Sequence, residues 1–86
     1  MARHRKLIEK IRARPAEADY RDVVRLLDDF GWIWERTIGS HNHFVKVGQL
    51  PMTIPTKHGR KVKRVYLDMI CDRLRLDEID LDDLED

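Results

Sequence analysis

The sequence has only one cysteine, Cys71, among its 86 residues. A single thiol forms no internal disulfide and supplies no thiolate cluster for a structural zinc ion. No apolar stretch is long enough to span a membrane, and no apolar signal core follows the basic first residues. A chain of this length holds one domain and leaves no room for a separate cofactor domain. We therefore expect a soluble, cytoplasmic protein with no cofactor domain and no zinc-thiolate site.

Acidic side chains are missing from the central third of the chain. Residues 36–64 carry no Asp or Glu, but they carry seven basic side chains, namely Arg36, Lys46, Lys57, Arg60, Lys61, Lys63 and Arg64. The balance reverses over residues 65–86, where acidic side chains far outnumber basic ones. A polyanion is attracted to the middle of such a chain and repelled by its end. The seven basic residues are therefore candidates for binding a polyanion such as a nucleic acid.

Two helices are predicted in the first third of the chain. Apolar residues at helical spacing indicate a short amphipathic helix over residues 3–13, which Pro15 closes. A second helix is predicted over residues 20–30, with Asp19 as its N-cap and Gly31 as its stop. Its apolar face consists of Tyr20, Val23, Val24, Leu27 and Phe30.

The pattern changes to that of β-strands after the second helix. Residues 32–38 are rich in aromatic and β-branched side chains, and residues 41–47 alternate between two faces, with Gly39 and Ser40 as the turn between them. This predicts a hairpin in which His41 and His43 share one face. Residues 51–54 predict a third short strand, placed at an edge by its flanking prolines.

The last helix is predicted over residues 62–75. Its apolar stripe consists of Val62, Val65, Tyr66, Met69, Ile70 and Leu74. Cys71 lies in this helix without a histidine nearby, which favours buried packing over a nucleophilic role. Residues 77–86 are strongly acidic, and we expect them to form a frayed tail. Such a tail solubilises the protein, folds back on the basic middle, or docks on a partner.

The predicted fold class is α+β. It consists of an extra N-terminal helix within residues 1–18, a domain over residues 19–76 and the acidic tail over residues 77–86. The domain has the order helix, three antiparallel strands, helix. Helices cover one face of the small sheet in this arrangement and leave the other face free to bind a ligand.

From about Tyr20 to Leu76 the chain resembles the HicA toxins, messenger-RNA interferases of type II toxin-antitoxin pairs. The strongest element of the resemblance is the block from Gly39 to Phe44, which reads Gly-Ser-His-Asn-His-Phe. It is supported by Leu26-Leu27 and Phe30-Gly31-Trp32 before the block, and by Thr53-Ile54-Pro55 with a basic loop after it.

The resemblance implies a fold like that of the double-stranded RNA-binding domain (dsRBD). It also implies metal-independent cleavage of mRNA, inhibition by a HicB-like antitoxin, and His41 as the catalytic residue. The sequence departs from the family in two places. Residues 1–18 are an addition, and His58 follows Pro55 by three residues, whereas many members carry a histidine closer to that proline.

Histidine suits the predicted chemistry, because imidazole both accepts and donates protons near neutral pH. Metal-free RNA cleavage needs a base for the 2′-hydroxyl, an acid for the leaving 5′-oxygen, and donors for the phosphorane oxygens. We expect His41 to act on a proton while the amides of Gly39 and Ser40 donate to the phosphate. His43 is either the second proton-transfer group or a packing and hydrogen-bonding residue.

Several alternatives remain open at this stage. His41 and His43 form a His-x-His pair, but no further ligand follows within ten residues, which disfavours a metal site. Trp32 and Trp34 either stack on bases or belong to the core. The run from Arg60 to Arg64 either binds phosphates or is a solvated helix start. The rival functions are a non-catalytic RNA-binding module and a protein-interaction subunit.

Overall fold

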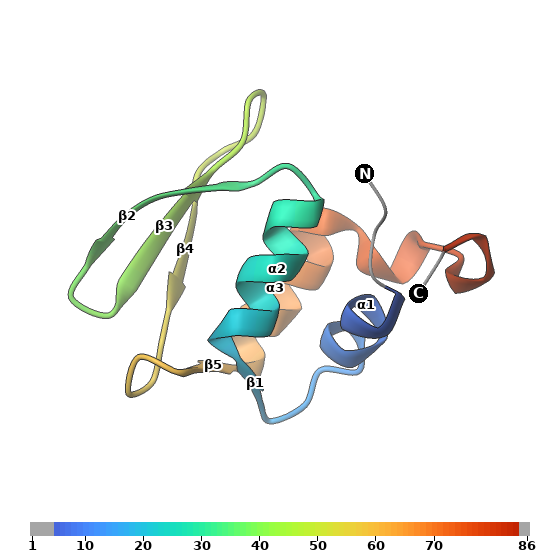
Figure 1. The fold of residues 1–86 in the computed structure, drawn as a ribbon, viewed down its shortest axis with the longest axis horizontal. Helices are drawn as coiled ribbons and strands as arrows, with labels where there is room; N and C mark the ends of the chain where they lie inside the picture. The colour runs from blue at the N-terminus through green and yellow to red at the C-terminus, as the bar shows by residue number, and fades with distance from the viewer. Residues whose placement is uncertain (1–4, 85–86) are drawn as a thin grey trace.

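The computed structural model describes residues 5–84 of the chain (Figure 1). In chain order its elements are α1 (Arg5–Arg12), β1 (Glu17–Asp19), α2 (Tyr20–Asp29), β2 (Ile33–Ile38), β3 (His41–Val45), β4 (Met52–Pro55), β5 (Lys61–Lys63), α3 (Arg64–Leu74) and the 3-10 helices η1 (Leu76–Glu78) and η2 (Leu81–Asp83). The predicted helices and the three predicted strands are present. The α+β architecture is consistent with a dsRBD-like fold.

Two short strands were not predicted. β1 and β5 pair in antiparallel fashion and form a ribbon separate from the sheet β2-β3-β4. Each has three residues, of which only the middle one is buried, namely Ala18 in β1 and Val62 in β5. A three-residue strand is too short to show an alternating pattern. The segment before Arg64 is therefore a strand, and α3 begins two residues later than expected.

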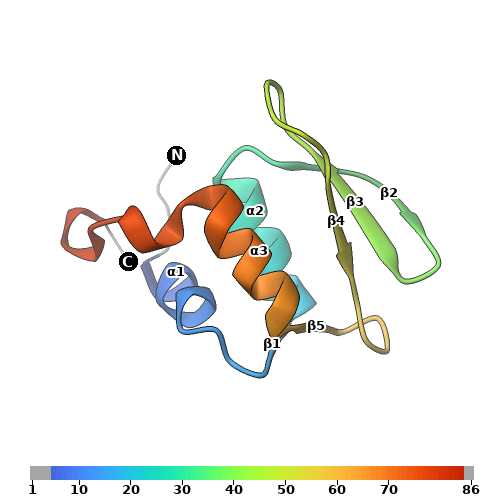
Figure 2. The ribbon, with the colours of Figure 1, turned by 180° about the vertical axis from the view of Figure 1, so that it is seen from behind.

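The helices α2 and α3 lie side by side between the sheet and α1 (Figures 1 and 2). From the sheet, Phe44, Met52 and Ile54 enter the core, and from α1 the fully buried side chains of Ile8 and Ile11 enter it. The added N-terminal helix therefore packs into the same core as the rest of the domain, on the side of α2 and α3 that faces away from the sheet. No helix among residues 5–84 is long and apolar enough to cross a membrane.

The buried face of α3 differs from the predicted stripe. Val65 was expected in the core, but 62% of its surface is exposed, whereas Leu67 is fully buried. The buried residues of α3 are Leu67, Ile70, Cys71 and Leu74, which also follow helical spacing. Because Val62 belongs to β5, it does not set the phase of the helix. Burial of Cys71 is confirmed, and its Sγ donates to the carbonyl of Ile11 at 3.6 Å.

Asp19 is the N-cap residue of α2, as predicted, but its side chain makes no cap hydrogen bond. Its carboxylate instead accepts a hydrogen bond from Lys61 Nζ at 2.5 Å, across the β1–β5 ribbon. This lysine holds the pKa of Asp19 below its usual value.

The expected frayed tail is also wrong for residues 77–84, which fold against α1. Leu76 is fully buried, and the 3-10 helices that follow place Leu81 and Leu84 against the core. The Arg12 guanidinium donates to the carbonyls of Leu76 and Ile79 at 3.3 and 3.1 Å. Arg14 forms an ion pair with Asp77 at 2.7 Å. The acidic segment thus contacts the N-terminal region and not the basic middle, while residues 85–86 lie outside the described chain.

Candidate active site

The face of the sheet that points away from the helices carries both central histidines. Asn42 and Phe44 on β3 are buried on the helix side, so the alternating residues His41 and His43 point to the opposite side. Directly paired residues of antiparallel strands point to the same face. Arg36 of β2 pairs with His43, and Pro55 of β4 pairs with His41. The histidines therefore share their face with a guanidinium on one side and a proline on the other.

A β-bulge places Arg36 on this face. The pairing moves from Trp34↔Phe44 directly to Arg36↔His43, so Glu35 is the extra residue on β2. In a regular strand Trp34 and Arg36 would point to the same side. With the bulge, Trp34 follows Phe44 to the helix side while Arg36 joins His43. The sequence gives no alternation signal for this change of face, and the register of Arg36 was not predicted.

The turn before His41 is hydrogen-bonded to β3 and to the residue that follows β4. Gly39 has φ +60°, a value that glycine adopts without strain. The carbonyl of Ser40 accepts the backbone N–H of Thr56, just after β4, at 2.9 Å. It also accepts the Asn42 side-chain amide at 3.4 Å. Because one donor lies on β3 and the other directly follows β4, the two hydrogen bonds fix the position of the turn and of His41, the first residue of β3.

Asn42 links the three strands from beneath the histidines. It is the one buried polar side chain among the described residues, with 5% of its surface exposed. Its Nδ2 donates to the carbonyl of Ile54 at 2.9 Å, and its Oδ1 accepts from the Thr37 hydroxyl at 2.8 Å. The same Thr37 oxygen accepts from Trp34 Nε1 at 2.9 Å. Sequence reasoning placed Asn42 on the correct face but missed this role, because its partners are set by register.

The two histidines differ in their surroundings. His43 is half-buried, and its Nδ1 lies 3.0 Å from the hydroxyl oxygen of Thr53 on β4. A hydrogen-bonding role for His43 is thus present, and a further role in proton transfer stays a prediction. His41 is exposed and makes no side-chain hydrogen bond or ion pair with any residue between 5 and 84. Its ring is open to a ligand.

A small cavity lies beside the strand position that faces His41. It has a volume of about 260 Å³ and is lined by Pro55, Thr56, Lys57, Lys63 and Tyr66. Pro55, one wall of the cavity, is the direct β4 neighbour of His41. Lys57 and Lys63 give it positive charge. Tyr66 adds a phenol from α3 that sequence reasoning assigned only to packing.

A comparison with known protein families matches residues 20–76 to the family described as the HicA toxin of bacterial toxin-antitoxin systems. The chain belongs to the HicA toxin family. The match begins at α2 and ends at Leu76, so it contains the histidine face, the turn and the adjoining cavity. α1, β1 and most of the acidic segment lie outside it. Comparisons with curated proteins and with solved structures find no match.

Not all the basic residues predicted to bind RNA lie near His41 in this HicA-family chain. The ammonium of Lys46 donates to the carbonyl of Phe30, at the end of α2, at 2.7 Å. Lys46 comes just after the last residue of β3, whereas His41 is the first, and five residues of strand span about 17 Å. Arg64 donates through Nε to the carbonyl of Arg14 at 2.9 Å. Lys46 and Arg64 therefore make structural contacts away from the histidine face.

Two lysines of the basic segment, residues 36–64, form ion pairs with acidic side chains of β1. β1 brings Glu17 to within 3.6 Å of Lys57 and Asp19 to within 2.5 Å of Lys61. The absence of acids along residues 36–64 is thus offset by the strand that pairs with β5. The side chains of Glu17 and Lys57 are both well exposed, and an exposed ion pair contributes little free energy. Lys57 is for this reason still free to exchange Glu17 for a phosphate.

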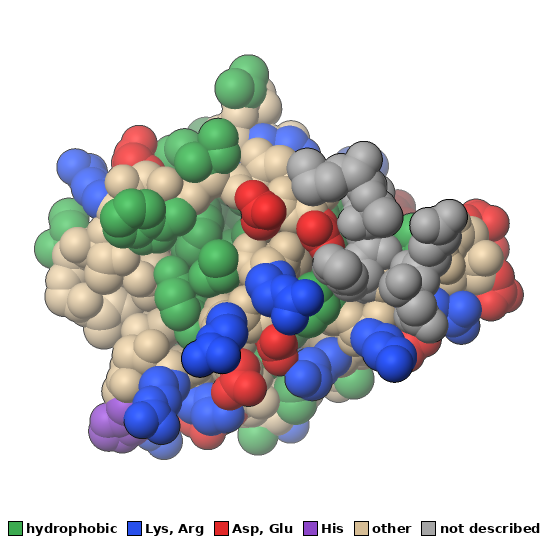
Figure 3. Space-filling model, viewed as in Figure 1, with side chains coloured by type: hydrophobic (Ala, Val, Ile, Leu, Met, Phe, Trp, Pro, Cys, Tyr) green, Lys and Arg blue, Asp and Glu red, His purple; other side chains and the backbone are tan. Residues whose placement is uncertain are grey.

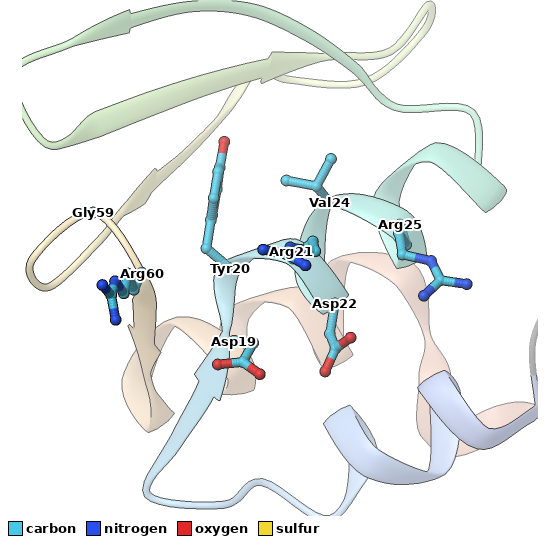
Figure 4. A pocket seen from close by; sticks show the side chains of 8 residues that line it. All are labelled: Asp19, Tyr20, Arg21, Asp22, Val24, Arg25, Gly59 and Arg60. Carbon is cyan, nitrogen blue, oxygen red and sulfur yellow. The ribbon is translucent and has the colours of Figure 1, made fainter.

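Arg60 lines a second, larger cleft on the helix side. This cleft, of about 840 Å³, is lined by Asp19, Tyr20, Arg21, Asp22, Val24, Arg25, Gly59 and Arg60. Figure 4 shows Tyr20 pointing from the start of α2 toward the sheet and Arg60 on the loop beside it. Both acids of the cleft already pair with lysines, Asp19 with Lys61 and Asp22 with Lys10. The structure thus groups Arg60 with α2 and not with His41.

The two tryptophans and His58, the remaining candidates, lie in different environments. Trp32 belongs to the core, with 3% of its surface exposed, whereas 53% of Trp34 is exposed. His58 occupies a positive-φ position in the exposed loop between β4 and β5. Within residues 5–84, no group of three or more His, Cys, Asp or Glu side chains is arranged to hold a metal ion.

Proposed function

We propose that this HicA-family toxin is an endoribonuclease that cleaves mRNA without a metal ion, with His41 as its proton-transfer residue. The observation that carries the proposal is the position of His41. It is exposed, it follows a turn to which Thr56 and Asn42 donate hydrogen bonds, and it shares its face of the sheet with Arg36 of β2, the partner of His43. The lysine-lined cavity lies beside Pro55, the direct neighbour of His41 on β4. A rigid strand end places an imidazole on an open, positively charged surface.

The proposed reaction is an attack by the RNA itself. The 2′-oxygen forms a bond to phosphorus while the bond from phosphorus to the 5′-oxygen breaks, which leaves a 2′,3′-cyclic phosphate and a free 5′-hydroxyl. His41 takes the proton of the 2′-hydroxyl or returns a proton to the 5′-oxygen. His43 is the candidate for the other proton. Arg36 and the backbone amides of Gly39 and Ser40 stabilise the charge that develops on the phosphorane.

Flanking phosphates are held by the cations that share the surface with His41. Lys57 and Lys63 line the cavity beside Pro55, and Arg36 lies on the opposite strand. Each phosphate contact adds affinity and a matching dependence on salt. The expected partner is a HicB-like antitoxin, which holds the toxin inactive, and the expected substrate places the protein in the cytoplasm.

The proposal is tested by cleavage of a defined RNA in the presence of EDTA. The His41→Ala variant should lose about 10²-fold or more in rate, because a positioned proton-transfer group contributes that much. Gln49→Ala is the control, since it removes an exposed polar side chain from the loop at the far end of β3 and should cleave like wild type. Near wild-type cleavage by His41→Ala would refute the assignment, and loss of wild-type cleavage with EDTA would refute the metal-free mechanism.

One observation favours a second candidate function, an RNA-binding module that does not cut. Thr53 already occupies Nδ1 of His43, so only His41 presents an imidazole without a partner on this face. The same assay separates the two functions. Wild-type protein that shifts the RNA in a binding assay without forming product would support the module and refute the enzyme.

A further inference from the structure

The strand β2 is an open edge of the sheet. All six of its residues are exposed, and the apolar side chains of Ile33 and Ile38 are 65% and 58% exposed. Figures 1 and 2 show β2 at the margin of the molecule farthest from α1, and Figure 3 shows hydrophobic side chains gathered over it. The other edge, β4, follows Pro51 and ends at Pro55, and proline offers no N–H to a new strand. An exposed apolar edge strand is a template for pairing with another chain.

The unpaired backbone groups of β2 belong to Trp34 and Thr37. In a two-residue hairpin the residues that flank the turn, here Ile38 and His41, form a hydrogen-bonded pair, and the two kinds of pair then alternate along the ladder. Thr37↔Asn42 and Trp34↔Phe44 are consequently non-hydrogen-bonded pairs. Their β2 members direct N–H and C=O away from β3. The open edge thus presents two donor and acceptor sets, three residues apart.

The sequence of β2 is complementary to itself when read in the opposite direction. An antiparallel copy centred between Glu35 and Arg36 pairs Trp34 with Thr37 of the second copy, which are the residues with outward backbone groups. The same register places Ile33 opposite Ile38 of the second copy. It also places Glu35 beside Arg36 of the second copy. Two apolar pairs and two opposite-charge pairs result, and each kind of cross-strand pair is stabilising.

The bulge makes this register possible. Residues 33 and 38 would point to opposite faces of a regular strand, because they are an odd number of positions apart. In β2 the extra residue, Glu35, puts Ile33, Arg36 and Ile38 on the face of the histidines, as their partners Val45, His43 and His41 show. Direct opposition requires side chains on the same face. A regular β2 would place Ile33 and Ile38 on opposite sides of the paired sheet.

We propose that β2 pairs with β2 of a second copy of this chain and forms a two-fold dimer with one continuous six-stranded sheet. The two-fold axis stands perpendicular to the sheet, so both His41 faces lie on the same side of it. The inference rests on the edge, the register and the charges of β2, and it holds whether or not His41 cleaves RNA. Charge complementarity selects a second copy over other occupants of the edge.

Charge reversal tests the pairing. All chains carry His41→Ala, so that expression does not depend on toxicity, and sedimentation velocity measures their mass over a range of concentrations. The parent should form dimers. Glu35→Arg places two arginines beside each other at both positions, and Arg36→Glu places two acids there, so each variant alone should dimerise at least tenfold more weakly. An equal mixture should recover the dimer, because each contact then joins opposite charges.

The mixture also controls for folding, since an unfolded variant would not form a dimer with the other variant. Both side chains are largely exposed, so thermal melts of the variants should match the parent. A parent that stays monomeric at all concentrations would overturn the proposal. So would single variants that dimerise like the parent, or a mixture that stays monomeric. A monomeric parent whose binding to a HicB-like antitoxin is lost in both variants would assign the edge to that partner instead.

Discussion

The Nδ1 atom of His43 lies 3.0 Å from the Oγ1 atom of Thr53, its direct neighbour on β4. This contact occupies one ring nitrogen and leaves the other, Nε2, as the atom available to a ligand. A hydrogen bond at one nitrogen selects the tautomer and the orientation of the ring. Thr53 is thus a positioning residue for His43, and its effect on the proposed reaction is separable from that of His41.

Thr53→Val should slow RNA cleavage by about tenfold, less than the roughly 10²–10⁴-fold that a proton-transfer group itself supplies. Valine keeps the shape of threonine but leaves the His43 ring without its partner. Single-turnover rates and RNA affinity are measured together, and the loss should fall on the rate and not on the affinity. Thr53→Ser is the control, because serine keeps the hydroxyl group that faces Nδ1 of His43. An unchanged single-turnover rate in Thr53→Val would remove His43 from the proton-transfer step.

Lys46→Met should destabilise the fold by about 1 kcal/mol and leave RNA affinity unchanged. Its ammonium donates to the carbonyl of Phe30 at the end of α2, and a charged hydrogen bond at a helix C-terminus contributes about this much. Urea unfolding and RNA titrations over a range of salt concentrations measure the two effects.

Lys63→Met is the matched comparison for Lys46→Met. Lys63 lines the cavity beside Pro55 and should hold a phosphate there, so its loss should weaken RNA binding and reduce the salt slope by about one. Stability should change little, since the side chain of Lys63 is exposed. A weakened RNA complex in Lys46→Met with Lys63→Met unaffected would contradict the proposed path of the RNA.

The sequence predicts the elements of this fold well where a periodic pattern is long enough. α2 and β3 each show several repeats of their period, and both lie where the pattern places them. The tripeptide that ends in His41 also lies on a turn and strand end, as expected. The ribbon of β1 and β5 is missed because three residues show no period, and with it the acids that meet Lys57 and Lys61.

The arrangement of the site depends on register, which local pattern does not encode. The bulge at Glu35 decides that Arg36 joins His43, and a single extra residue changes the face of every residue after it. The hydrogen bonds of Asn42 follow from the pairing of three strands. The tail was expected to fray because its composition is acidic, but the buried Leu76 just before it and the apolar residues Ile79, Leu81 and Leu84 within it pack against the core.

Leu76→Ala should lower the free energy of unfolding by about 2–5 kcal/mol, the cost of truncating a buried leucine. Leu76 is fully buried where the chain leaves α3, and Arg12 donates to its carbonyl. The measurement is urea unfolding followed by circular dichroism. Leu84→Ala, at a partly buried position in the same segment, should cost less. Equal and small losses of stability in both variants would instead support a frayed tail.

Asp77→Asn should lower the melting temperature at neutral pH, and the difference from wild type should disappear in acid. The hydrogen bond from Arg14 holds the pKa of Asp77 below 3.8, its usual value in an unfolded chain. A carboxyl with a lowered pKa stabilises the folded state fully above the unfolded value. That contribution is lost as the pH falls through 3.8 toward the lower pKa of the folded state. Melting curves at closely spaced pH values measure it.

Asp83→Asn is the control, because Asp83 is an exposed acid of the same segment whose side chain has no ion-pair or hydrogen-bond partner among residues 5–84. It should follow the wild-type melting temperature at every pH. The test compares two single-carboxyl changes in one segment, so general charge effects of the acidic tail cancel. A difference between wild type and Asp77→Asn that stays constant below the usual aspartate pKa would show that Arg14 does not select the charged form of Asp77. The contact between the tail and α1 would then rest on apolar packing alone.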